Sequence, residues 1–253
     1  MGFFYYKNKK VYYEEFGSGK PLLMLHGNTS SSNMFKEIIN KYRDDYKVIV
    51  IDFLGHGKSD RLNEFPVDLW FDESQQVISF LKEKKYNKVY IIGVSGGALV
   101  AINVGLEAPE LVDKIIVDSF EGEKSIKEFT KDLVKNRQIS KENEGTRLFY
   151  QYMHGEDWEG VVDNDTKAIV KHSETIGKFF HKPLEHFKAE ILLTGSMEDE
   201  FFTCIDKEYF NKVYKNMVEK MNHGEIYLFE KGGHPSITSN SEEFVNISKK
   251  FLK

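Results

Sequence analysis

Apolar residues gather along the chain in short, unbroken runs that end in glycine or small polar residues. Six such runs occupy residues 21–27, 47–55, 87–97, 112–120, 189–196 and 224–234. Continuous rather than alternating apolar runs indicate strands that are buried on both faces, as in a parallel sheet. Two aromatic segments, residues 3–6 and 11–16, predict a further pair of strands joined by a turn at residues 7–10.

The segments between these runs place apolar residues three and four positions apart, which predicts helices. They occupy residues 33–42, 68–84, 98–106, 207–220 and 241–252. Asp68 or Asp72 is a candidate cap for the second of these helices, and Ser241 is the expected N-cap of the last. Strands that alternate with helices in this way predict an α/β fold, with a mostly parallel sheet covered by helices on both sides.

One long segment departs from this alternation. Residues 119–189 contain no convincing buried strand and are instead charged and helix-prone. A segment of this length is too long for an ordinary connection between two elements of a sheet. We therefore expect a helical insertion of residues 119–189 over one end of the sheet, with residues 1–118 and 190–253 forming the core.

The third apolar run ends in the sequence Gly-Val-Ser-Gly-Gly at residues 93–97, which matches the pattern G-x-S-x-G between a strand and a helix. In such a sharp turn only very small residues fit at Gly93 and Gly97, and the hydroxyl of Ser95 is exposed above a helix N-terminus. A glycine-rich phosphate loop is the alternative, but this turn contains neither Gly-Lys-Ser/Thr nor G-x-G-x-x-G. The motif therefore makes Ser95 a candidate nucleophile.

A serine nucleophile needs a base, and the base needs an acid that orients it. His234 is the last residue of the last run, just past the predicted strand, so we expect it at the same edge of the sheet as Ser95. Acidic residues follow the preceding run, which gives the chain order serine, acid, histidine. Asp199 is the preferred acid, while Glu198 and Asp118 remain alternatives.

Catalysis at a carbonyl also needs two N–H groups that bind the developing negative charge. We expect the backbone N–H groups of Gly96, which follows the nucleophile, and of Asn28, in the loop after the first apolar run. His26 lies in the same loop, and we expect it to shape the loop rather than to transfer protons.

These motifs together resemble the α/β-hydrolase superfamily. The segments LHGN, DFLGHGKSD, GVSGG, GSMEDEF and GGHP occur in the order and at the spacing of that family, and the resemblance extends from about Pro21 to Leu252 apart from the insertion. It implies an eight-stranded sheet with one antiparallel edge strand and a helical cap inserted after the sixth strand. It also implies that His56, within DFLGHGKSD, has a structural role.

Within this family, the identity of the nucleophile narrows the expected reaction. The segment HGN also resembles that of dehalogenases of this fold, which use an aspartate nucleophile with a tryptophan beside it; here Ser95 and Gly96 stand at those positions. We therefore expect a serine hydrolase that cleaves a small carboxylic ester through an acyl-enzyme intermediate. A lactonase, thioesterase, carbon–carbon bond hydrolase or aminopeptidase on the same triad remains an alternative, as does a non-enzymatic ligand sensor.

Six apolar residues in or beside the insertion are candidates for the wall of a substrate pocket. They are Phe120, Phe149, Tyr152, Met153, Trp158 and Phe202. Basic and acidic residues are evenly mixed in the insertion, so the sequence gives no support for phosphate-bearing or CoA substrates. The remaining histidines, among them His154 and His172, are expected on the surface or in the insertion.

Composition restricts the partners and cofactors. With 35 basic against 40 acidic residues, the net charge of -5 gives no electrostatic reason to expect nucleic acid or an anionic membrane. The single cysteine, Cys204, excludes an intrachain disulfide and a cysteine-based metal site, and no His-x-x-x-His pair or carboxylate cluster has metal-ligand spacing. We expect no metal, nucleotide or flavin.

The expected cellular location rests on one long apolar stretch and on the N-terminal sequence. The uncharged stretch of residues 89–106 contains four glycines and fits a strand followed by a helix better than a membrane span. The N-terminus lacks the charged start and apolar run of a secretory signal, so a cytoplasmic location is expected. The oligomeric state is left open.

Overall fold

The computed structural model describes all residues, 1–253, and contains one eight-stranded sheet with the strand order β1-β2-β4-β3-β5-β6-β7-β8. The strands are β1 (Gly2–Tyr6), β2 (Lys9–Phe16), β3 (Lys20–Leu25), β4 (Tyr46–Asp52), β5 (Val89–Val94), β6 (Val112–Asp118), β7 (Glu190–Ser196) and β8 (Glu225–Phe229). Strands β3 to β8 are parallel to one another, while β2 pairs antiparallel with both β1 and β4, which confirms the mostly parallel sheet.

The helices lie between the strands and at the end of the chain. They are α1 (Lys36–Tyr42), α2 (Leu69–Glu83), α3 (Gly96–Glu107), α4 (Lys127–Lys131), α5 (Leu133–Glu142), α6 (Glu144–His154), α7 (Trp158–Thr175), α8 (Glu200–Thr203), α9 (Tyr209–Met221), α10 (Ser236–Ser239) and α11 (Ser241–Leu252). Two 3-10 helices, η1 (Ser32–Phe35) and η2 (Leu184–His186), complete the set.

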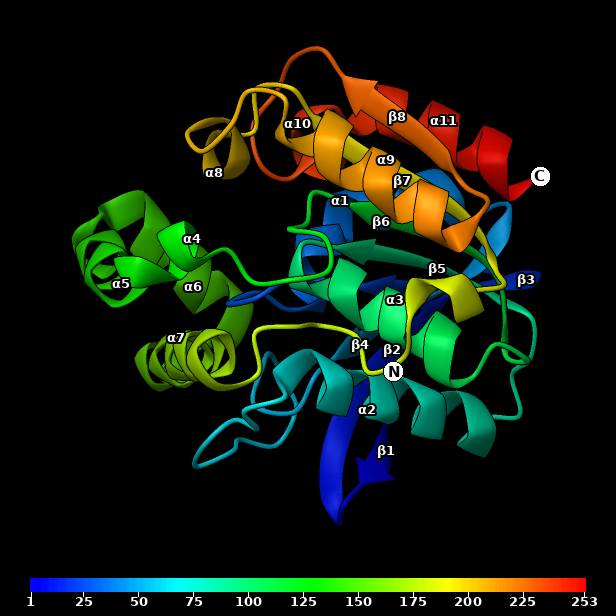
Figure 1. Cartoon of the computed structure of the whole chain (residues 1–253). Coiled ribbons are helices and arrows are strands. Elements are labelled where there is room, and N and C mark those ends of the chain that lie inside the picture. Colours follow the sequence, from blue (N-terminus) through cyan, green and yellow to red (C-terminus); the bar gives the residue numbers. More distant parts are fainter.

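Helices cover both faces of the sheet, because its central strands are apolar on both sides. Residues of α2, α3 and α9 pack against one face in a single large cluster of buried side chains. Residues of α1 and α11 pack against the other face in a second cluster. Figure 1 shows α2, α3 and α9 side by side on the face toward the viewer.

Helices α4–α7 form the insertion after β6, as expected from the charged, helix-prone segment. In Figure 1 they gather at the left of the molecule, apart from the helices that cover the sheet. The division of the chain into a core of residues 1–118 and 190–253 and a cap of residues 119–189 stays a prediction.

Three local expectations differ from the structure. The one antiparallel strand is β2, which lies one position in from the edge strand β1 rather than at the edge. Strand β8 is only partly buried, because it lies at the edge of the sheet and pairs with β7 alone. At the last helix the N-cap is Asn240, not Ser241, which is already the first helical residue. Asp68 is the N-cap residue of α2, but its side chain makes no capping hydrogen bond.

Candidate active site

Ser95 occupies the turn between β5 and α3. Its backbone has φ +54° and ψ −121°, a conformation that L-residues rarely adopt and that is typical of strained functional turns. Side chains at the flanking glycines have no space: a Cβ at Gly93 would lie 2.3 Å from the carbonyl oxygen of Gly97, and one at Gly97 would lie 2.2 Å from that of Leu25. The close approach of these backbones explains the glycines of the motif.

His234 lies between Ser95 and Asp199 in space. Its Nε2 is 3.2 Å from Ser95 Oγ, and its Nδ1 is 2.8 Å from Asp199 Oδ2. The three residues follow β5, β7 and β8, and the carboxyl ends of parallel strands meet at the same edge of a sheet. Asp199 is fully buried, and its other carboxylate oxygen accepts a hydrogen bond from the N–H of Phe201. The aspartate is therefore held from both sides.

The two alternative acids have other partners. Glu198 accepts a hydrogen bond from the N–H of Gly232 at 3.2 Å. Asp118 accepts hydrogen bonds from the N–H of Ile237 and the hydroxyl of Thr194, and burial raises its pKa to about 6. Neither carboxylate contacts the imidazole of His234, so Asp199 alone is in position to orient the ring.

The N–H groups of Asn28 and Gly96 have no hydrogen-bond partner within the chain. Gly96 is the first residue of α3, where a helix leaves its N–H groups unpaired. Asn28 follows β3, and both the nitrogen and the oxygen of its side-chain amide form hydrogen bonds. Its Nδ2 donates to Asp165 Oδ2 at 3.0 Å, and its Oδ1 accepts from Trp70 Nε1 at 3.1 Å. This arrangement fixes the loop that carries the Asn28 N–H.

Asp165, on helix α7 of the insertion, is a residue that the sequence did not single out. It is fully buried, and the same oxygen, Oδ2, also accepts from the N–H of Thr29 and lies 3.2 Å from His56 Nε2. Burial acts to raise the pKa of Asp165, but the hydrogen bond and charge of His56 outweigh it and hold the pKa below its ordinary value. The insertion thus reaches the Asn28 loop through one carboxylate.

More buried titratable groups surround this carboxylate. His26 accepts a hydrogen bond from the N–H of Phe53, and burial holds its pKa well below its usual range. His154 accepts from the N–H of Gly57, and burial lowers its pKa to about 3. Burial raises the pKa of Glu73 well above its usual range. His154 and His172 belong to the insertion, but both are buried rather than on the surface.

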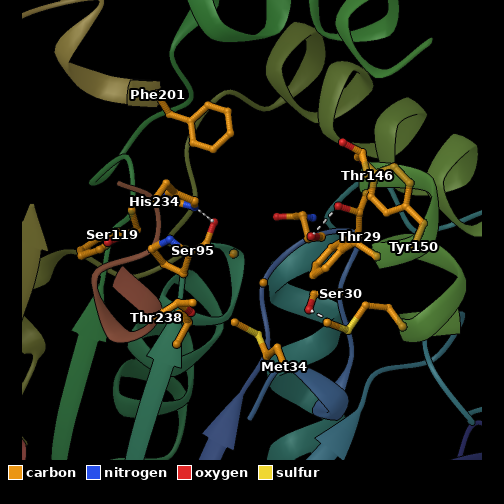
Figure 2. Close-up of a pocket in the computed structure, with 18 of the residues that line it drawn as sticks. Thr29, Ser30, Met34, Ser95, Ser119, Thr146, Tyr150, Phe201, His234 and Thr238 are labelled. Carbon is orange, nitrogen blue, oxygen red and sulfur yellow. Dashed lines mark hydrogen bonds between the residues drawn. The ribbon is translucent and has the colours of Figure 1, made fainter. Parts of the chain in front are cut away.

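A pocket of about 790 Å³ opens beside Ser95 and His234. Five of the six expected residues line it: Phe120, Phe149, Tyr152, Met153 and Phe202. Trp158 does not, because it is buried inside the insertion, where its ring stacks on Tyr150 at 5.5 Å. Figure 2 shows Ser95 and His234 on one side of the pocket and Thr146 and Tyr150 on the other.

The pocket also contains charged residues that were not foreseen, namely Lys36, Glu37, Glu121, Arg137 and Glu200, of which Glu121 and Arg137 lie in the insertion. Glu121, just beyond β6, lines the pocket, and burial raises the pKa of its carboxyl to about 7. Arg137, on α5, also lines the pocket and forms no ion pair. The sequence offered no signal for either, since both lie in the charged, helix-prone segment.

Nowhere in the chain is a group of three or more His, Cys, Asp or Glu side chains placed to hold a metal ion.

The family model described as the alpha/beta hydrolase fold matches residues 20–147. The chain belongs to the α/β-hydrolase fold family. A proline iminopeptidase of Clostridium botulinum is 24% identical over 99% of this chain and 97% of that protein. The uncharacterized hydrolase YraK of Bacillus subtilis is 26% identical over 137 residues, or 50% of this chain and 49% of YraK.

A solved esterase from Exiguobacterium antarcticum superposes on this α/β hydrolase with a TM-score of 0.76, 20% identity and coverage of 100% of both chains. At this identity the likeness shows the fold. An enol-lactonase and haloalkane dehalogenases are also among the similar proteins, so the family includes several reactions. Three curated relatives, YraK among them, are matched over 37–49% of their own length. None of the helices combines the length and apolar character that a bilayer crossing requires.

Proposed function

We propose that this α/β hydrolase is a serine hydrolase that cleaves a small carboxylic ester through an acyl-enzyme intermediate. The observation that carries the proposal is the continuous chain of contacts from Ser95 Oγ to His234 Nε2 at 3.2 Å and from His234 Nδ1 to Asp199 Oδ2 at 2.8 Å, at the edge of a pocket. A hydroxyl, an imidazole and a buried carboxylate in this order are the elements of acyl transfer.

In the first half of the reaction, Ser95 Oγ attacks the ester carbonyl while His234 Nε2 takes the hydroxyl proton. The N–H groups of Asn28 and Gly96 bind the oxyanion that forms, since neither has another partner. When the tetrahedral intermediate collapses, His234 returns the proton to the leaving alkoxide. Asp199 holds the Nδ1–H tautomer and stabilises the imidazolium.

In the second half, a water molecule gives a proton to His234 Nε2 and attacks the acyl carbonyl. The bond to Ser95 Oγ then breaks, and His234 returns the proton to the serine. The aromatic side chains around the pocket favour an apolar acyl or alcohol portion of the substrate. We propose a small-molecule ester as the substrate on these grounds.

Turnover of a 4-nitrophenyl ester by the wild type and by Ser95→Ala tests this function. Removal of a triad nucleophile lowers kcat by about 10⁶-fold in a serine hydrolase. Ser125→Ala is the control, because this serine lies outside the pocket and bonds only to the carbonyl of Gly177. Unchanged turnover in Ser95→Ala would exclude Ser95 as the nucleophile.

A second measurement separates the enzyme from a ligand sensor and the ester from other substrates. Wild-type protein in excess ester should release product over many turnovers; one turnover followed by a stable bound state would instead indicate a sensor. A panel of ester, lactone, thioester and amide substrates should give the highest kcat/KM for the ester.

A further inference from the structure

Arg137 has an environment that no other arginine of the pocket region shares. Its Nη1 donates to the hydroxyl of Tyr150 at 2.9 Å, while its Nε is buried without a hydrogen-bond partner. No carboxylate lies within ion-pair distance of its guanidinium; Asp165, an anion near enough to interact electrostatically, is bonded to Asn28, Thr29 and His56 instead. Arg137 is half-buried, and its remaining donors are available to a negatively charged ligand in the pocket.

Arg61, which contacts Asp157 of the insertion, serves as a comparison because its role is structural. Its guanidinium contacts both carboxylate oxygens of Asp157, at 2.7 and 2.8 Å. It also donates to the backbone carbonyls of Gly57 and His154. Arg61 is therefore fully paired and ties the insertion to the core, whereas Arg137 keeps donors free at the wall of the pocket.

Two hydroxyl groups extend the donors of Arg137. Ser140 lies one helical turn further along α5, so its side chain shares a face with Arg137, and both line the pocket. Tyr150 is 2% exposed, and its oxygen accepts from Arg137, which leaves its own proton free to donate. The hydroxyl of Thr146 donates to Asn143 and adds no donor. Together, Arg137, Ser140 and Tyr150 present one cation and two hydroxyls.

We propose that Arg137, Ser140 and Tyr150 form a subsite for a carboxylate of the substrate. A single guanidinium matches the charge and planar geometry of one carboxylate, whereas a phosphate dianion would call for further cations. Figure 2 shows Tyr150 across the pocket from Ser95, so the carboxylate lies at the end of the substrate remote from the scissile carbonyl. The substrate class is a carboxylate-bearing ester, and this inference rests on the proposed function.

Two pairs of esters test the subsite and locate the carboxylate. The acyl pair is mono-4-nitrophenyl adipate and its neutral counterpart 4-nitrophenyl hexanoate. The alcohol pair is 5-butyryloxypentanoate and pentyl butyrate. Hydrolysis of these two esters is measured by the release of butyric acid. Hydrogen bonds to a charged group lead us to expect about a 10- to 100-fold higher kcat/KM for the anionic member of one pair. Equal kcat/KM within both pairs would overturn the subsite.

Arg137→Met should remove the preference for the anionic ester, with a much smaller change in kcat/KM for the neutral ester. Arg147→Met is the matched control, because Arg147 lies on the adjacent helix α6 but is exposed and outside the pocket. Equal losses on both esters, or the same change in both variants, would overturn the subsite. If Arg137→Met does not fold, Arg137→Lys replaces it and should show an intermediate preference, because it keeps the charge. The preference of the wild type for the anionic ester then decides whether the subsite stands.

Calorimetric titration with adipate and with hexanoate separates this inference from the proposed function. If no ester is hydrolysed but wild-type protein binds adipate at least tenfold more tightly than hexanoate, and Arg137→Met does not, the subsite stands and the esterase function fails. If esters are hydrolysed without any preference for a carboxylate in turnover or binding, the function stands and the subsite fails.

Discussion

The pocket has two walls that differ in how their polar groups are held. The core wall contains Ser95 and His234, which stand on loops at the ends of parallel strands and contact one another in a fixed chain that ends at Asp199. The insertion wall contains Arg137 and Tyr150, which stand on helices and retain unused donors. Preorganised contacts suit a reaction common to many substrates, while free donors suit recognition of one substrate.

Asp165 connects the insertion to the loop of the core that contains Asn28 and Thr29. It belongs to the insertion by sequence, yet its hydrogen bonds go to Asn28 and Thr29 of the core. The loop that we propose to bind the oxyanion is therefore positioned by the insertion. The comparison teaches that the insertion contributes to positioning as well as to the shape of the pocket.

The strongest test of the core wall compares two adjacent acids. Asp199→Asn removes the acceptor that orients His234, and we expect kcat to fall by about 10⁴-fold with a smaller change in KM. Glu198→Gln loses only the charge of an acceptor for a backbone N–H, so we expect a change below about tenfold. Steady-state kinetics on one ester measures both. A larger loss in Glu198→Gln would reverse the assignment of the acid.

Asp165→Asn tests whether the insertion positions the core wall. An uncharged amide accepts the bonds of Asn28 and Thr29 more weakly and faces His56 without a charge, so we expect a loss of about 1–3 kcal/mol in the free energy of unfolding. We also expect a fall in kcat of about tenfold with KM nearly unchanged, because the oxyanion donors lose their fixed position while the substrate pocket remains.

Asp163→Asn is the matched control on the same helix. Asp163 pairs with Lys141 at 2.5 Å, and its side chain is 50% exposed. Removal of such a pair changes stability by about 0–1 kcal/mol and should leave kcat unaltered. Urea denaturation and steady-state kinetics measure the two effects. A fall in both kcat and substrate affinity for Asp165→Asn would indicate general loosening rather than positioning.

The smallest expected effect concerns Glu121 and pH. Its pKa of about 7, raised by burial, means that the carboxyl gains a negative charge as the pH rises from 6 to 8. That charge repels a carboxylate-bearing ester, so the ratio of kcat/KM for adipate and hexanoate esters should fall by about two- to fivefold over this range. Groups that act on both esters alike cancel in this ratio.

Glu121→Gln should make this ratio independent of pH between 6 and 8. Its amide has nearly the same shape as the protonated carboxyl, so turnover of the neutral ester serves as the internal control. A pH dependence that persists in Glu121→Gln would show that another group sets the charge of the pocket.

Much of the core was predictable because its signals are local. The six apolar runs became β3 to β8, and the misfit of residues 119–189 indicated the insertion that contains α4–α7. Ser95, Asp199 and His234 were chosen because each lies at or just past the end of such a run, and parallel strands bring their carboxyl ends together. Periodicity did not show that β2 would lie between β1 and β4, because pairing between strands is a non-local choice.

The insertion was less predictable for a physical reason. Amphipathic helices show which residues are apolar but not which partner covers them, so Trp158 became internal packing while Phe149 and Tyr152 reached the pocket. Charged residues in such helices are usually solvated, and the sequence treated Arg137 and Asp165 in that way. Only their tertiary neighbours distinguish them.

The sequence by itself determined the parallel sheet, the sharp turn at Ser95 and the order of serine, acid and histidine, since these depend on residue types at short spacings. The tertiary structure decided that Asp199 rather than Glu198 faces His234, that Asp165 holds the Asn28 loop, and that the Nε of Arg137 has no hydrogen-bond partner. These contacts join residues far apart in the chain, and their energies depend on burial and distance, which exist only once the chain has folded.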